Sequence, residues 1–243
     1  MSRALVGTGR LIRFILRRDR FLLPGWAVWL AIVPLAATSA FKGLYPTQEA
    51  LNIAAQDLDT NPAFRAMFGP VYGTSIGSLV AWRASIILVV IGVLSALTVI
   101  RHTRVEEETG RRELVGSTVI GRHAPLTAAF VVAVLTDAGV GVLIALGIAA
   151  QGIPMAGSIA LGVQMAAAGI LFAAIGALAA QLTATAGGAR GSAFSVIGLA
   201  YVIRAAGDSG DAGWLSGLTV TSTGNRQSSF GSSRTQRPLA SAR

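Results

Sequence analysis

Apolar stretches long enough to cross a membrane, separated by short charged segments, limit the fold of this chain most strongly. Four of them run over residues 22–40, 84–100, 126–150 and 159–182. A hydrocarbon core about 30 Å thick is crossed by about 20 apolar residues in a helix. Mean hydropathy is +0.63, and 13% of residues are charged against about 25% in soluble domains. The sequence therefore predicts an all-α integral membrane protein.

A fifth stretch, between Arg190 and Arg204, is shorter. Its 13 uncharged residues, 191–203, cover about 20 Å as a helix. It crosses the bilayer only if the flanking arginines extend their side chains to the headgroups. We expect about five transmembrane helices, near residues 22–40, 84–100, 126–150, 159–182 and 191–206.

Basic residues, all but one of them arginine, are concentrated in two segments. Six arginines lie in residues 1–20, where Asp19 is the one acid, and five lie in residues 101–125. Residues 151–158 carry no charge. Short arginine-rich loops stay in the cytoplasm. We therefore predict a multi-pass protein of the cell (plasma) membrane, with its N-terminus in the cytoplasm and residues 42–83 outside.

The first segment has the pattern of an interfacial helix. Its arginines fall on one helical face and its leucines and isoleucines on the opposite one, which is typical of a helix lying in the membrane surface. A solvated flank that only sets the topology is the alternative. With the apolar stretches described above, the sequence predicts three parts: a basic interfacial helix (1–20), a transmembrane domain (21–206) and a disordered tail (207–243).

The tail differs in composition from the rest of the chain. Residues 219–243 hold six Ser, four Thr and four Arg with no acid, which predicts disorder. Five spans would put these arginines outside, against the charge bias of the other loops. We interpret the tail as an out-of-frame translation or a truncation scar, and an ordinary disordered tail is the alternative.

The connection after the first span predicts two short helices. Thr47–Leu58 favours one helix. Asn61-Pro62 is typical of a cap followed by proline at the first helical position, and Gly69-Pro70 ends this second helix.

Two patterns suggest chemistry, and neither is complete. Gly-Thr-Ser-Ile-Gly at residues 73–77 matches a nucleophile elbow, which needs a strand–turn–helix setting and a histidine base. Both histidines, His102 and His123, fall on the predicted opposite side. His102 and Glu106 have the spacing of two metal ligands on one helix face, but a third ligand is not apparent nearby. We predict no catalytic residue, no bound metal, no cofactor and no nucleic-acid partner.

Two features lie within the spans. Asp137 is near the middle of the third, where a charge costs about 3 kcal/mol; the apolar residues around it return about 5 kcal/mol, so the helix still inserts. An intramembrane carboxylate is a functional candidate, and a structural residue satisfied within its helix is the alternative. Small residues at four-residue spacing in the fourth span allow close helix packing: Gly162, Ala166, Gly169, Ala173 and Ala177.

The segment between the second and third spans reads Glu-Glu-Thr-Gly-Arg-Arg-Glu-Leu over residues 107–114. A short charged helix of this kind suits docking into a soluble partner, with charge pairs fixing the register. A solvated hairpin that joins two spans is the alternative. Thr103 and Glu106 have the spacing of a capping box, unless the second span continues into this segment.

This segment resembles the coupling segment of type-2 ABC exporter permeases. The resemblance extends in the same order along roughly residues 1–216. Its further motifs are the basic N-terminal helix, Tyr45-Pro46-Thr47, Asn61-Pro62-Ala63, Gly69-Pro70-x-Tyr72 and Ala81-Trp82-Arg83. The combination is similar to permeases that export polyketide antibiotics of the tetronasin type.

The resemblance implies a permease of about twelve spans in two six-span halves, driven by a separate ABC ATPase. No Walker A motif occurs in this chain, which agrees with a separate ATPase. The chain resembles the first half without its last span, so a second permease half or a second copy is a further expected partner. The coupling residues are then Glu107, Glu108, Gly110, Arg112 and Glu113. The competing hypothesis is a membrane anchor or accessory protein that docks a soluble partner through residues 101–125.

Overall fold

The computed structural model describes residues 3–110 and 121–209. Five long helices make up most of these residues: α2 (Leu22–Leu44), α5 (Ile76–Ile100), α8 (Ala124–Ala149), α9 (Met155–Leu182) and α10 (Ala186–Ser209). Each is long and apolar enough to cross a membrane. The predicted all-α membrane fold with about five spans is confirmed. The disordered tail was predicted over residues 207–243; residues 207–209 belong to α10, and the rest of it lies outside the described residues.

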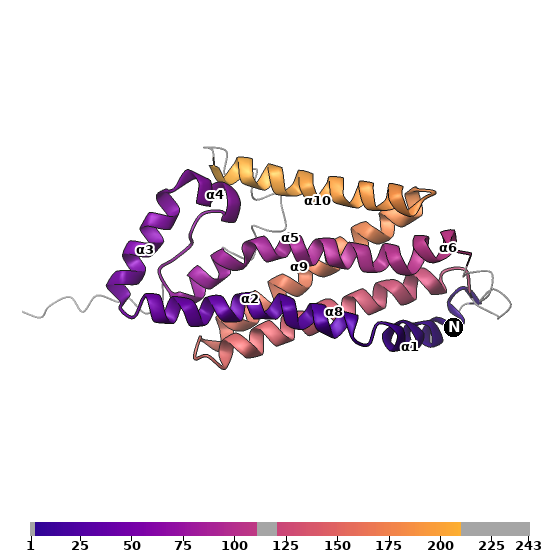
Figure 1. Cartoon of the computed structure of the whole chain (residues 1–243), viewed down its shortest axis with the longest axis horizontal. Coiled ribbons are helices and arrows are strands. Elements are labelled where there is room, and N and C mark those ends of the chain that lie inside the picture. Colours follow the sequence, from indigo (N-terminus) through magenta and orange to yellow (C-terminus); the bar gives the residue numbers. More distant parts are fainter. Residues whose placement is uncertain (1–2, 111–120, 210–243) are drawn as a thin grey trace, which may run out of the picture.

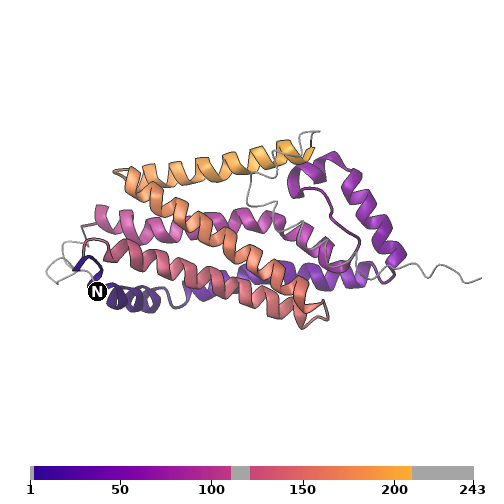
Figure 2. The same ribbon diagram turned by 180° about the vertical axis from the view of Figure 1, so that it is seen from behind.

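The long helices form one elongated bundle, and the short helices lie at its two ends (Figure 1). Helix α1 (Thr8–Arg18) lies with the N-terminus at one end. The opposite end carries α3 (Gln48–Thr60) and α4 (Pro62–Phe68). Figure 2 shows α9 running obliquely across the bundle from the start of α10 to the end of α8.

Helix α5 lies at the centre of the core. Its Leu88 and Ile91 are fully buried and pack with buried residues of α2, α8 and α9. The outer faces of the bundle are also apolar: Leu146, Val163 and Val202 are each about 60% exposed. A large exposed apolar surface marks contact with something other than water, and lipid is the medium that fits helices of this length.

Glycines bring α8 and α9 into close contact, as the four-residue spacing predicts. A Cβ atom built on Gly162 would lie 2.3 Å from the carbonyl oxygen of Gly141. Since real Cβ atoms do not approach a carbonyl oxygen so closely, the crossing requires glycine at this position.

Helix α5 begins eight residues before the predicted span 84–100, and the continuous helix that contains it, Ile76–Glu108, also extends beyond residue 100. It begins at Ile76 because the Ser75 hydroxyl accepts a hydrogen bond from the backbone N–H of Ser78 at 3.1 Å. Ser75 is the serine of the Gly-Thr-Ser-Ile-Gly motif, so its side chain acts as a helix cap.

At the other end α5 continues through a π-helical turn (Arg101–Val105) into α6 (Glu106–Glu108). The Thr103 hydroxyl donates to the carbonyl of Val99 at 2.7 Å inside this continuous helix. The second span thus continues past Thr103, which is the condition under which the spacing of Thr103 and Glu106 forms no capping box.

Helix α4 has the predicted cap, whereas Thr47, the first residue of the helix predicted over 47–58, caps α3 from just outside it. Thr47 accepts from the N–H of Ala50, and Asn61 accepts from the N–H groups of Ala63 and Phe64. Helix α4 then ends at Gly69, whose φ of 87° favours glycine.

Helix α10 is also longer than expected, and Arg204 does not extend toward headgroups. This arginine is 5% exposed. It donates to the carbonyl of Met67 at 2.7 Å and pairs with Asp208 at 3.3 Å. The expectation for Arg204 is wrong because α4 folds back over α10 and provides acceptors there (Figure 1).

Candidate functional site

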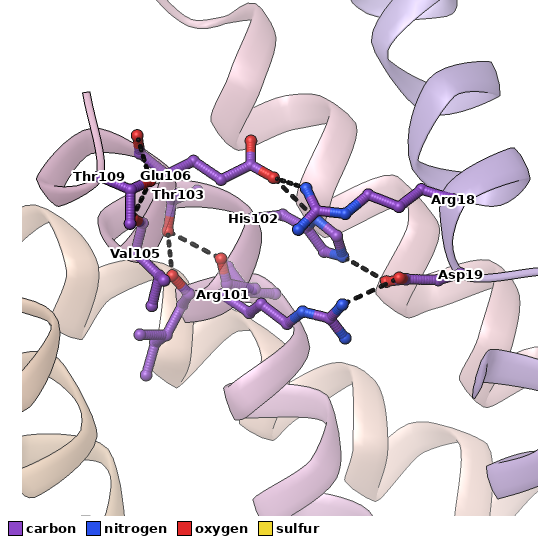
Figure 3. Close-up of polar contacts among 10 residues, drawn as sticks. Arg18, Asp19, Arg101, His102, Thr103, Val105, Glu106 and Thr109 are labelled. Atoms are coloured by element: carbon purple, nitrogen blue, oxygen red, sulfur yellow. Dashed lines mark hydrogen bonds and ion pairs between the residues drawn. The ribbon is translucent and has the colours of Figure 1, made fainter. Parts of the chain in front are cut away.

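Charged side chains from two distant segments meet at the end of the bundle that carries α1. The C-terminal end of α1 supplies Arg18, and Asp19 follows it directly; the π-helical turn after α5 supplies Arg101 and His102 (Figure 3). A backbone hydrogen bond also joins the two segments at this end of the bundle: the N–H of Gly121, just before α8, donates to the carbonyl of Val6, just before α1, at 2.9 Å. Both arginine-rich segments therefore lie together.

Asp19 is the centre of this group. It is 3% exposed. Its Oδ1 atom accepts from the Arg101 guanidinium at 3.0 Å, and its Oδ2 atom lies 2.8 Å from His102 Nε2. A carboxylate at this depth needs such partners, because an unpaired buried charge is strongly unfavourable.

Glu106 extends the group toward α1. Its Oε1 atom accepts from Arg18 at 2.5 Å and lies 3.5 Å from His102 Nδ1. The Nδ1 atom makes no hydrogen bond to the described residues. We call Arg18, Asp19, Arg101, His102 and Glu106 the charge cluster. With a neutral histidine its two positive and two negative charges balance.

The same turn also contacts α9 and α10. Arg104 donates to the carbonyl of Ala180 near the end of α9 and pairs with Glu107 at 2.6 Å. Glu108 accepts from the N–H of Ala186, the first residue of α10, at 2.6 Å. A carboxylate at a helix N-terminus is favourable. Residues 101–108 thus link α1, α9 and α10.

The structure places three of the five predicted coupling residues. Glu107 and Glu108 make the contacts above, although we expected them to face a partner. Gly110 follows the end of α6 with a φ of 67°, and its N–H donates to the carbonyl of Glu107 at 3.1 Å. Arg112 and Glu113 lie outside the described residues.

Sequence reasoning missed Asp19 and His102 as partners. Asp19 carried one signal, because it is the single acid among six arginines. Asp19 adds a third possible metal ligand to His102 and Glu106, whose spacing in the sequence was that of two ligands. Within the described residues, however, no group of three or more His, Cys, Asp or Glu residues is placed to hold a metal ion.

Asp137 is buried between helices, about two turns of α5 away from the charge cluster. It is 4% exposed, and its Oδ1 atom accepts from the Ser95 hydroxyl at 2.6 Å. Gly169 of α9 leaves room for it, since a Cβ there would lie 2.4 Å from the carboxyl carbon. Its Oδ2 atom has no hydrogen-bond partner among the described residues.

Five membrane-length helices and a charge cluster at one end of the bundle define a multi-pass helical membrane protein. Over 216 residues the chain is 44% identical to the multidrug efflux system permease protein Rv1217c of Mycobacterium tuberculosis. The alignment covers 87% of this chain and 39% of that protein, so the chain spans about two fifths of its relative's length. No protein-family model matches the chain.

Proposed function

We propose that this chain is a membrane-spanning part of an ATP-driven exporter permease, with ATP hydrolysed on a separate ABC subunit. The observation that carries the proposal is the 44% identity to an efflux permease over 216 residues, a stretch that includes most of the bundle. The proposed cargo is a hydrophobic or amphiphilic small molecule. Polyketide antibiotics are the class implied by the resemblance to tetronasin-type exporters.

The proposed contact with the ATPase is the segment 101–125, with the basic helix at residues 10–20 as a second candidate. The coupling residues of the segment 101–125 are Glu107, Glu108, Gly110, Arg112 and Glu113. Support comes from the contacts of this segment with α1, α9 and α10. A movement imposed on residues 101–108 by a docked ATPase would reach three helices directly. In this proposal the N-terminus and the charge cluster face the cytoplasm, in agreement with the bias of arginine-rich segments.

Co-purification from native membranes tests the proposal. The affinity-tagged full-length chain is expected to retain a Walker-motif ATPase, identified by mass spectrometry. Reversal of the charges, with Glu107→Lys, Glu108→Lys and Glu113→Lys together, should abolish its recovery. Asp57→Lys is the matched control, because Asp57 is an exposed acid at the opposite end of the bundle.

Thermal unfolding of each variant shows whether the fold survives, which matters because Glu107 and Glu108 also make contacts within the chain. A folded triple variant that still retains the ATPase would refute the coupling assignment. Recovery of a soluble partner without ATPase activity would favour the membrane anchor instead.

A further inference from the structure

A cavity of about 510 Å³ lies beside the charge cluster, among α2, α5, α8 and α10. Trp26 of α2 and Phe194 of α10 line it and are 39% and 41% exposed. The cavity therefore opens at the side of the bundle, between these two helices. A ligand dissolved in the membrane would reach it from that side.

The cavity has two polar ends of different character. Asp19, Arg101 and His102 form one end, where the acid already pairs with both bases. Asp137 and Ser95 form the other. Ser95 and His102 are seven residues apart, so the two ends are separated by about 10 Å along α5.

The Asp137 end has an unmet hydrogen-bonding requirement. Asp137 is 4% exposed, and the Oδ2 atom of its carboxylate has no hydrogen-bond partner among the described residues. The neutral Ser95 hydroxyl is the one hydrogen-bond partner of this carboxylate among the described residues, and a neutral donor offsets a buried negative charge only in part. Because Asp137 lines the cavity, a ligand that carries a positive charge into it would offset the charge of this carboxylate.

The remaining lining defines the rest of the ligand. Leu94 and Val140 provide apolar surface beside the two aromatic rings, and such rings attract organic cations as well as apolar groups. Arg101 and Arg190 line the cavity too. These arginines repel a second positive charge on the same ligand.

We infer that this cavity binds amphipathic organic monocations, with the positive charge at Asp137 and the apolar body between Trp26 and Phe194. The assignment of this ligand as cargo rests on the proposed export function, whereas its binding does not. The opposite end of the cavity, formed by Asp19, Arg101 and His102, belongs to the charge cluster, so a bound ligand would lie next to that cluster.

Direct binding to the full chain tests the inference. The chain is placed in nanodiscs of phosphatidylglycerol, which offer no lipid ammonium group as a competitor. Radiolabelled tetraphenylphosphonium and tetraphenylborate are compared, since they share a shape and differ in the sign of their charge. We expect saturable binding of tetraphenylphosphonium and none of tetraphenylborate, after subtraction of partition into empty nanodiscs.

Variants at the Asp137 end of the cavity test the role of the carboxylate directly. Asp137→Asn should weaken tetraphenylphosphonium binding about tenfold or more, the effect of losing one charge-assisted contact. Asp137→Glu keeps the charge and should retain most of the affinity. Asp59→Asn is the matched control, because Asp59 is an acid of α3 outside the cavity, and it should leave binding unchanged.

Unchanged affinity in a folded Asp137→Asn variant would overturn the inference, as would equal saturable binding of both probes. If Asp137→Asn does not fold, the charge preference of the wild-type chain decides by itself. The measurement needs no ATPase. Failure of the unaltered chain to retain an ATPase would therefore refute the export proposal while leaving the binding site in place. Failure of the unaltered chain to bind tetraphenylphosphonium would refute the binding site while leaving the export proposal in place.

Discussion

Asp19 and His102 meet at 2.8 Å, and this contact joins the loop after α1 to the π-helical turn after α5. Both side chains are buried. The two residues are 83 positions apart in the chain, so the contact forms only when the N-terminal helix packs onto the bundle. π-Helical turns are frequent at functional sites, and this one carries the side chains that hold α1.

Replacement of Asp19 should loosen this end of the bundle. In Asp19→Asn, Arg101 and His102 lose their shared anion, and we expect the free energy of unfolding in detergent to fall by about 2 kcal/mol. The cost stays below that of a fully buried ion pair because the Arg101 side chain is 39% exposed. Chemical unfolding of the purified chain measures it.

Asp57→Asn provides the control for this variant, since Asp57 is exposed in α3. It should change the unfolding free energy by less than about 0.5 kcal/mol. Equal effects of the two substitutions would contradict the role of Asp19 in holding α1.

The fold was largely predictable because it depends on the length of apolar stretches and on local caps. Thr47, Asn61 and Gly69 mark the ends of α3 and α4 in the sequence as they do in the structure. Errors arose where a helix continued past an expected end. Helix α5, for example, begins at Ile76 with Ser75 as its cap, before the expected start at residue 84.

The candidate site was less predictable because its contacts join distant segments. Nothing near Asp19 in the sequence indicates Arg101 or His102 as its partners. Arg204 shows the same limit: its acceptor, the carbonyl of Met67, lies 137 positions away. Local patterns identify charged residues but do not give the packing that pairs them.

Gly110 should resist replacement by residues with a Cβ atom. Its φ of 67° lies in the left-handed region, and no atom of the described residues lies within 4 Å of a Cβ built there. The cost of Gly110→Ala is therefore backbone strain of about 1 kcal/mol, while Gly110→Asn should be milder because asparagine tolerates this conformation. In chemical unfolding, the free energy of unfolding should be highest for the wild type with glycine, lower for Gly110→Asn and lowest for Gly110→Ala. Equal stability of the alanine and asparagine variants would contradict the prediction.

Arg204 should hold α4 against α10. We expect Arg204→Met to lower the unfolding free energy by about 3 kcal/mol, because it removes one member of a buried charged pair. Hydrogen exchange should rise in residues 62–69, because the Met67 carbonyl loses one of its two donors among the described residues and keeps the Tyr201 hydroxyl. Arg190→Met is the control, since Arg190 is an exposed arginine of the same helix. Increased exchange in both variants would argue against a specific role for Arg204.

The crossing of α8 and α9 offers a matched pair of glycines. Gly162→Ala should destabilise the bundle by about 1–3 kcal/mol through overpacking, because its Cβ would meet the Gly141 carbonyl. Gly157→Ala lies in the same helix, and among residues 3–110 and 121–209 nothing lies within 4 Å of the added Cβ. It should be neutral or slightly stabilising, since alanine favours helix. Thermal unfolding separates the two, and equal melting temperatures would refute the close crossing.

The proposed orientation can be tested with single cysteine variants. Because the chain has no cysteine of its own, a purified variant carries label only at the introduced residue. Gly9→Cys in α1 and Gly157→Cys in α9 each add a thiol at a position with open space around the new Cβ. The two positions lie in helices that begin at opposite ends of the bundle (Figures 1 and 2). In intact cells a membrane-impermeant maleimide should label Gly157→Cys alone, and Gly9→Cys should react only after permeabilisation. The reverse pattern would place the charge cluster outside the cell, where no ATP-driven subunit could reach it.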